Sequence, residues 1–162
     1  MGNKITGTLP AMPPTTEHLI LNFNKFDNID SVNQLSEMTV LYAIGNNLEN
    51  INASFGATLE NLQLAGNRFK TYDIKWTENA DNLKDLNLKR NPWVCDCDMV
   101  EFRNALETDE ILQKKIQCQN IHGAPYIDDL SADMFCYEKP STTSGSIIFK
   151  GGLVLALGIF LR

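Results

Sequence analysis

The fold is decided by the stretch Leu62-Gln63-Leu64-Ala65-Gly66-Asn67-Arg68-Phe69, whose pattern apolar-x-apolar-x-x-Asn-x-apolar occurs four times in this chain of 162 residues. The other copies span residues 19–26, 41–48 and 86–93. Their asparagines, Asn24, Asn46, Asn67 and Asn91, stand 22, 21 and 24 residues apart. A repeat of this length is typical of a solenoid, in which each coil packs only on its neighbours.

The alternation inside each copy predicts a short strand with one buried face. The alternating pairs are Leu19 and Leu21, Leu41 and the smaller Ala43, Leu62 and Leu64, and Leu86 and Leu88. The chain must turn after each strand, and the turn leaves backbone groups inside the coil without a partner in the sheet. A short amide side chain can satisfy such groups, so the four asparagines are predicted to form a hydrogen-bonded ladder.

Further apolar residues complete each repeat: Ile29, Ile51 and Tyr72 follow the asparagines, and Phe55 is placed to fill the core. The combination resembles the leucine-rich repeat family over roughly residues 1–91. That resemblance implies an α/β solenoid, a short coil with a parallel sheet on its concave side. The alternative, a chance run of Leu and Asn in a helical domain, is disfavoured by four copies in phase.

All four cysteines follow the repeats, at Cys95, Cys97, Cys118 and Cys136. Four cysteines allow three pairings, and spacing alone does not choose among them. Cys95 and Cys97 are too close to bridge comfortably, so each is expected to reach a different distant partner. A zinc site built from all four is the alternative, although zinc sites favour pairs separated by two to four residues.

The run Asn91-Pro92-Trp93-Val94-Cys95-Asp96-Cys97 resembles the C-terminal flanking cap of extracellular leucine-rich repeat proteins. The resemblance implies a disulfide-bonded helical cap over residues 92–139, with Cys95 paired to Cys118 and Cys97 paired to Cys136. Such a cap would cover the hydrophobic end of the last coil.

A helix is expected to open this cap, because residues 98–101 have the form of a weak capping box with Asp98 at the start and Glu101 three residues later. Met99, Phe102 and Leu106 would share one face of the helix. We expect that face, with Trp93, to lie over the end of the repeat core.

The chain carries a net charge of −6 and no run of basic residues, which argues against a nucleic-acid partner. Paired cysteines indicate an oxidising compartment. The sequon Asn52-Ala53-Ser54 falls on the turn after the second strand, so Asn52 is a candidate glycosylation site. We therefore expect an extracellular or cell-surface glycoprotein.

The first residues, 1–6, contain no apolar segment of the kind found in a secretory signal. Asn3 lies 21 residues before Asn24 and is therefore in phase with the ladder. The segment 9–19 also resembles the lead from an N-terminal cap into a first repeat. We expect these residues to belong to a longer protein with further repeats.

Residues 140–162 combine a stretch of small residues with an apolar tail. The tail from Ile147 to Leu161 has 15 residues and contains Lys150, so it is shorter than the ~20 residues of a spanning helix. The segment resembles a glycolipid-anchor signal with Ser144, or its neighbours Ser141 and Gly145, as the attachment site. A truncated transmembrane helix and an apolar end without an anchoring role are the alternatives. Either anchor would make the membrane a partner.

Residues between the buried strand positions should point to the concave side of the coil. We expect a protein ligand there, on a face that is apolar toward the N-terminus and polar toward the C-terminus. The candidate contact residues are His18, Ile20, Phe23, Tyr42, Ile44, Gln63 and Asn87. The alternative is a structural spacer or dimerisation module without its own ligand, in which another coil or a second copy covers these side chains.

An enzyme is not expected, because the sequence contains none of the nucleophile, zinc-protease or phosphate-loop motifs and has only two histidines. His122 lies in the cap segment with no acidic or nucleophilic motif beside it. No cofactor and no metal site are predicted.

Overall fold

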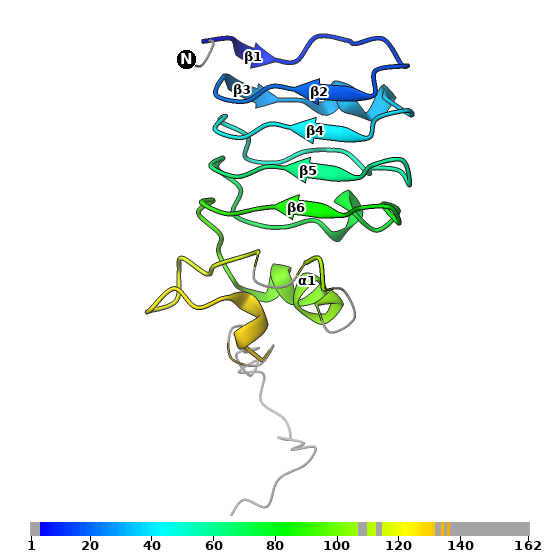
Figure 1. Cartoon of the computed structure of the whole chain (residues 1–162). Helices are drawn as coiled ribbons and strands as arrows, with labels where there is room; N and C mark the ends of the chain where they lie inside the picture. Colours follow the sequence, from blue (N-terminus) through cyan, green and yellow to red (C-terminus); the bar gives the residue numbers. More distant parts are fainter. Residues whose placement is uncertain (1–3, 107–109, 113–114, 132–133, 135, 137–162) are drawn as a thin grey trace, which may run out of the picture.

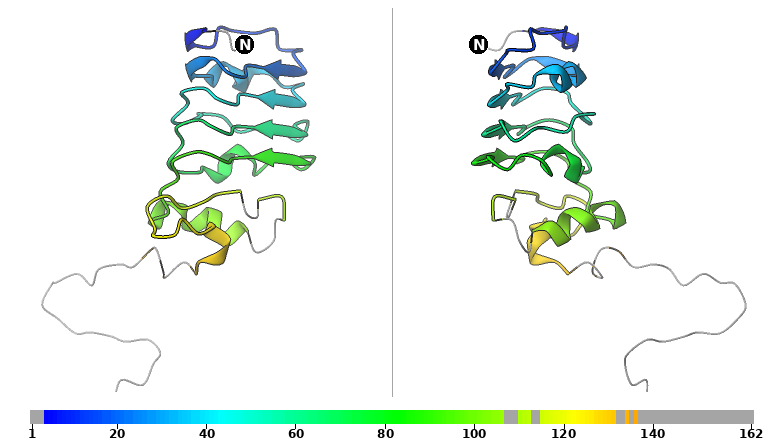
Figure 2. Two further views of the ribbon diagram at one scale, coloured as in Figure 1. Left: turned by 60° about the vertical axis from the view of Figure 1, so that its left-hand side comes forward. Right: turned by 90° about the vertical axis from the view of Figure 1, so that its right-hand side faces the viewer.

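The computed structural model describes residues 4–106, 110–112, 115–131, 134 and 136, and it shows coils stacked one above the next (Figure 1). Asn3 and the tail 140–162 with Ser144 lie outside these residues. Each coil contributes one strand to a parallel sheet of order β2-β4-β5-β6. The strands are β2 (His18–Ile20), β4 (Val40–Tyr42), β5 (Asn61–Gln63) and β6 (Asp85–Asn87). The sheet runs along one side of the stack, as both views of Figure 2 show.

A second, two-stranded sheet lies at the N-terminal end of the solenoid. It pairs β1 (Thr6–Thr8) with β3 (Lys25–Asn28) in parallel, so residues 4–17 complete a partial coil ahead of β2. Two of the return segments between strands contain short 3-10 helices, η1 (Asp30–Gln34) and η2 (Ile74–Trp76). All described helices are much too short to span a bilayer.

The ladder asparagine of the central coil, Asn67, bonds backbone groups of two coils. Its side-chain oxygen accepts from the Leu48 N–H at 3.2 Å. Its amide nitrogen donates to the carbonyl of Ala43 at 2.9 Å, in the preceding coil, and to that of Leu64 at 3.0 Å, in its own coil. One side chain therefore closes its own turn and ties it to the coil before.

Asn46 and Asn91 repeat this pattern in the coils on either side, and both are buried. Asn24 keeps the bond from its amide nitrogen to the Leu21 carbonyl, at 2.9 Å, and accepts from the Ile5 N–H at 3.3 Å. It is only half-buried, because its coil is the first one with a strand in the four-stranded sheet. The four asparagines thus form the predicted ladder, with its most exposed member at the N-terminal end.

The hydrophobic core is one continuous cluster that extends from the repeats into the cap. Aromatic rings join the two parts: Phe69 lies edge-on to Trp76 at 5.1 Å and is stacked with Trp93 at 6.0 Å. Tyr72 contacts Phe102 in the cap at 4.4 Å between ring centroids. These contacts seal the last coil against water, as the sequence predicts for Trp93 and Phe102.

Two disulfides close the cap, one between Cys95 and Cys118 and one between Cys97 and Cys136. This is the pairing that the resemblance implies. With both disulfides formed, no cysteine is left as a thiolate that could bind zinc. The alternative hypothesis of a zinc site built from the four cysteines therefore does not fit the structure.

The start of the cap helix differs from the sequence prediction. The side chain of Asp96 accepts from the Asp98 N–H at 3.1 Å and opens a 3-10 turn, η3 (Cys97–Met99), which leads into α1 (Val100–Ala105). Asp98 therefore lies inside the first turn, and no capping box forms between Asp98 and Glu101. The apolar face is as expected, because Met99, Phe102 and Leu106 are all buried. A final 3-10 turn, η4 (Ile127–Asp129), packs Ile127 into the core.

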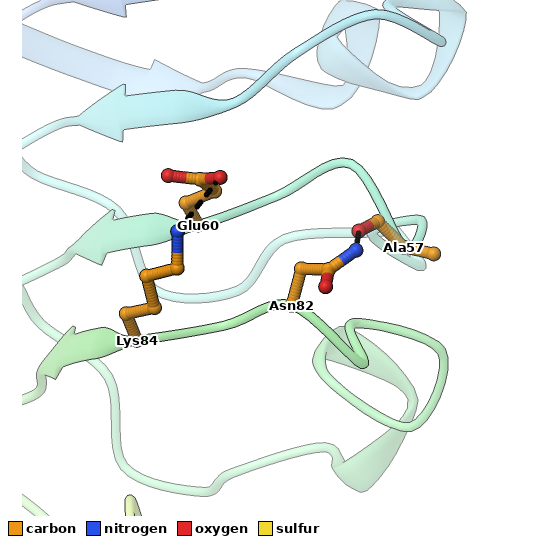
Figure 3. A network of polar contacts seen from close by, with 4 residues as sticks. All are labelled: Ala57, Glu60, Asn82 and Lys84. Atoms are coloured by element: carbon orange, nitrogen blue, oxygen red, sulfur yellow. Dashed lines mark hydrogen bonds and ion pairs between the residues drawn. The ribbon is translucent and has the colours of Figure 1, made fainter.

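Side chains on the surface also link neighbouring coils (Figure 3). Lys84 forms an ion pair with Glu60 at 2.9 Å, and Asn82 donates to the Ala57 carbonyl at 2.7 Å. The ion pair is solvent-exposed and is worth at most about 1 kcal/mol. The ladder inside the coils therefore does more than these surface contacts to align the repeats.

Replacing Asn67 with Leu should lower the free energy of unfolding by about 1–3 kcal/mol, because the buried N–H of Leu48 loses its acceptor. Urea denaturation of the two proteins measures the difference. The matched control is Asn61→Leu, since the Asn61 side chain is half-buried on the strand face and has no hydrogen bond to other described residues. The control should change stability by less than about 0.5 kcal/mol. An equal loss of stability in the two variants would mean that the ladder hydrogen bonds of Asn67 do not stabilise the coil.

Removing the Cys97–Cys136 disulfide with a double Ala substitution should destabilise the protein by about 3–4 kcal/mol, because the bridge spans 39 residues and restricts the unfolded chain. Thermal or urea unfolding without reductant checks this. The Cys95–Cys118 double variant, which opens a loop of 23 residues, should lose a similar amount. Unchanged stability in both would mean that the cap does not support the repeats.

Candidate functional site

The strand residues between the buried positions form columns across the four-stranded sheet. The register aligns His18 with Val40, Asn61 and Asp85, and aligns Ile20 with Tyr42, Gln63 and Asn87. These are the columns expected from the sequence, because the strands are parallel and the repeats are in phase. The sheet therefore places most of the candidate contact residues on one face.

The N-terminal part of this face is apolar. We call Ile20, Phe23, Tyr42 and Ile44 the apolar patch. Ile20 is 66% exposed and Phe23 is 61% exposed, while Tyr42 and Ile44 are half-buried. Ile20 is the register partner of Tyr42, and the Phe23 N–H donates to the Ile44 carbonyl at 2.7 Å. The four residues thus come from two adjacent strands and the turns that follow them.

The residue before each ladder asparagine adopts a left-handed backbone conformation. In the two inner coils it is a glycine, Gly45 with φ 68° and Gly66 with φ 66°. In the two outer coils it is Phe23 with φ 57° and Arg90 with φ 58°. A residue with a side chain is strained in this region by about 1 kcal/mol. The repeat turn imposes this conformation in every coil. The two strained residues, Phe23 and Arg90, therefore lie at the two ends of the sheet.

The ring of Phe23 lies over the glycine of the next coil. A Cβ atom added to Gly45 would come within 2.8 Å of Cδ1 of Phe23. The small residue at position 45 therefore leaves room for the ring, which stays largely exposed on its other side. The sequence places Phe23 in a column but does not reveal its backbone conformation or this contact.

The C-terminal part of the face is polar, and one expected contact residue there is not accessible. Gln63 is only 8% exposed, and its amide nitrogen donates to a carboxylate oxygen of Asp85 at 2.8 Å. Asn87 is half-buried, and its side-chain oxygen accepts from the Lys89 N–H at 3.3 Å. Gln63 differs from the expectation because its neighbour in the next strand has a carboxylate that holds it against the sheet.

The remaining predicted residues lie apart from the apolar patch. His18 is exposed on β2, the edge strand at the N-terminal end of the sheet, and His122 is exposed in the cap. Asn52 is exposed after the buried Ile51, and its backbone N–H donates to Asp30 at 2.9 Å. A glycan on Asn52 would therefore project from the surface of an ordered turn.

A hollow of about 580 Å³ lies where the last coil meets the cap, and the sequence analysis did not find it. Its lining includes Lys89 and Arg90 from the turn after β6, and Lys115, Gln117 and Gln119 from the cap. The absence of a basic run in the sequence is therefore misleading, because the fold brings basic residues together from distant segments. The sequence does contain a hint of this hollow, which is the alternation of polar and apolar residues at 115–119. Ile116 and Cys118 are buried there, so the three polar residues between and beside them share one face.

No protein-family model matches the sequence. Among solved structures, the chain is similar to the crystal structure of human 5T4 (Wnt-activated inhibitory factor 1, trophoblast glycoprotein), with a TM-score of 0.62 and 25% sequence identity. The match covers 74% of this chain and 46% of that chain, so this chain spans less than half the length of the 5T4 structure. The parallel sheet, the coil repeat and this likeness together show that the protein has a leucine-rich repeat solenoid fold.

Proposed function

We propose that the protein is an extracellular protein-binding module that uses the apolar patch on the concave face of its sheet. The observation that carries the proposal is the exposure of Ile20 and Phe23, at 66% and 61%; among the described residues, the other large apolar side chains that are exposed are Ile5 and Met134, which lie off the four-stranded sheet. Exposed apolar and aromatic residues with a polar rim are typical of protein interfaces. Polar residues beside the patch are His18, two residues before Ile20 on β2, and Asn22, whose side-chain oxygen accepts from the Ile44 N–H at 2.9 Å.

The backbone strain at Phe23 supports a functional role for this side chain. A glycine at position 23 would relieve the strain, as the glycines of the inner coils do. Strained residues tend to cluster at functional sites. We infer that the exposed ring contributes to binding more than to folding.

An extracellular location is supported by the two disulfides, which persist in oxidising compartments. It is also supported by the likeness to a protein described as a trophoblast glycoprotein, which agrees with the exposed sequon at Asn52. The run from Asn91 to Cys97 further supports a flanking cap of the extracellular type. We therefore propose a glycosylated cell-surface protein.

A second candidate function is dimerisation through the same patch. It is favoured by the position of the patch at β2, which is one of the two edge strands of the described sheet, because an edge strand can pair with a strand of another chain. In this case the partner is a second copy of the chain rather than a different protein. Light scattering after gel filtration separates the two candidates.

The apolar patch should lose its ligand when its exposed residues are replaced. In a binding screen against a panel of cell-surface ectodomains, Ile20→Ser should weaken a captured interaction by about tenfold or more, as expected for an anchor residue worth 1–2 kcal/mol. Phe23→Gly should weaken it similarly while leaving the melting temperature unchanged or higher, because the strain is relieved. A fall in melting temperature without a loss of binding would contradict the role given to Phe23.

The matched control is Ile5→Ser, because Ile5 is also largely exposed but lies ahead of β1 and off the four-stranded sheet. It should leave binding within about twofold. If instead the wild-type protein is a dimer that Ile20→Ser converts to a monomer, the dimerisation function is correct. A monomer that captures no ectodomain from the panel would argue against both functions.

Membrane attachment is a further part of the proposal, and it rests on the sequence of residues 141–162. Behind a borrowed signal peptide, a chain ending at Pro140 should be released into the medium, while the full chain should stay on cells. A phospholipase that cleaves glycolipid anchors should free the full chain if Ser144 or a neighbour carries the anchor. Retention after the enzyme would favour a transmembrane helix, and secretion of the full chain would exclude both anchors.

A further inference from the structure

The hollow between the last coil and the cap has walls that are fixed by covalent and hydrogen bonds. One wall is the segment 115–119, which the Cys95–Cys118 disulfide ties to the end of the repeats. The Gln119 N–H donates to the Trp93 carbonyl at 2.9 Å, and the Asn120 side chain bonds both the N–H and the carbonyl of Cys95. The opposite wall is the turn that carries Lys89 and Arg90. The hollow is therefore preformed, and a ligand would bind without ordering the site first.

Alternation along the cap segment directs its polar residues to the hollow. Ile116 and Cys118 are fully buried in the core, so Lys115, Gln117 and Gln119 share the opposite face, and all three line the hollow. An isolated antiparallel bridge between Gln117 and Tyr126 holds this segment extended. The cap thus presents a row of one cation and two amides to the turn of the last coil.

The charge of the hollow is opposite to that of the whole protein. Lys89, Arg90 and Lys115 line it, and none of the other described residues of the lining is acidic. None of the three forms an ion pair with another described residue. Since the protein as a whole carries a net charge of −6, this concentration of unpaired positive charge is a local exception. Like charges in a shared hollow repel one another, and an anionic ligand would relieve that repulsion.

Arg90 gives an independent reason to assign a function to the hollow. It holds a left-handed backbone conformation, with φ 58°, at the position where the inner coils have glycine. The strain is tolerated although glycine would remove it. The long cationic side chain at this position lines the hollow, where a glycine would leave the site with two cations instead of three.

We propose that this hollow binds a short acidic peptide segment, whose carboxylates are held by Lys89, Arg90 and Lys115 and by the amides of Gln117 and Gln119. The rest of the lining favours a peptide over a long sulfated glycan. Pro92, which is exposed, gives the hollow an apolar part that suits side-chain methylene groups. A long polyanion that extended beyond the hollow would meet a surface that is acidic overall, since the protein carries a net charge of −6. The site is distinct from the apolar patch, so its test does not depend on the function proposed for the concave face.

The test measures fluorescence anisotropy of a labelled eight-residue peptide containing four Glu residues, titrated with the full chain at low salt. A peptide with Gln in place of each Glu is the matched probe. We expect binding of the Glu peptide alone. Lys89→Glu and Lys115→Glu should each weaken it by about tenfold or more, since a charge is reversed beside the carboxylates. Lys25→Glu makes the same change of net charge on β3, at the far end of the solenoid, and should leave affinity within about twofold.

Arg90→Gly separates binding from folding. It removes a cation and the backbone strain together, so peptide affinity should fall by about fivefold or more while the thermal midpoint does not fall. Equal binding of the Glu and Gln peptides would overturn the proposal, because the carboxylates would then not be recognised. Equal weakening by Lys25→Glu would also overturn it, because binding would then follow the net charge of the protein rather than the hollow. A sulfated oligosaccharide that binds in a Lys89- and Lys115-dependent way, with no binding of the peptide, would overturn the choice of ligand.

Discussion

The constraint on which the structure depends is the need to satisfy backbone polar groups that each coil buries when it turns after its strand. Without a partner, each of these groups would cost about 1–3 kcal/mol. Asn46, Asn67 and Asn91 supply the partners, and each of them also bonds the coil before it. The spacing of the coils therefore follows from hydrogen-bond length, and the in-register sheet follows from the spacing of the coils.

The same turn explains why the two surfaces of interest lie at the ends of the sheet. It requires a left-handed residue before each asparagine, and the inner coils meet this requirement with Gly45 and Gly66. The outer coils instead place Phe23 and Arg90 there, one apolar and one cationic. The same backbone position therefore carries an apolar side chain at one end of the sheet and a basic side chain at the other.

The sequence is most predictive where it repeats. The asparagine ladder, the buried strand positions and the aligned columns all follow from four copies in phase, because each copy repeats the same local physics. Prediction is weaker in the cap, where Asp96 rather than Asp98 starts the helical turn. It also misses contacts between coils and segments: the bond that buries Gln63 against Asp85, and the meeting of Lys115 with Lys89 and Arg90. These depend on how distant segments fold together, and no periodic pattern encodes that.

The position of the disulfides has a mechanical consequence. If the protein is pulled by its two ends, tension that enters at Cys136 passes through the sulfur atoms to Cys97 and bypasses the 38 residues between them. The segment that forms one wall of the hollow lies inside this bypassed loop, so it carries no load. The force instead reaches the repeats directly, and because each coil contacts only its neighbours, the coils would detach one at a time from the ends of the stack. A molecule built in this way would lengthen stepwise under load while its cap stays folded.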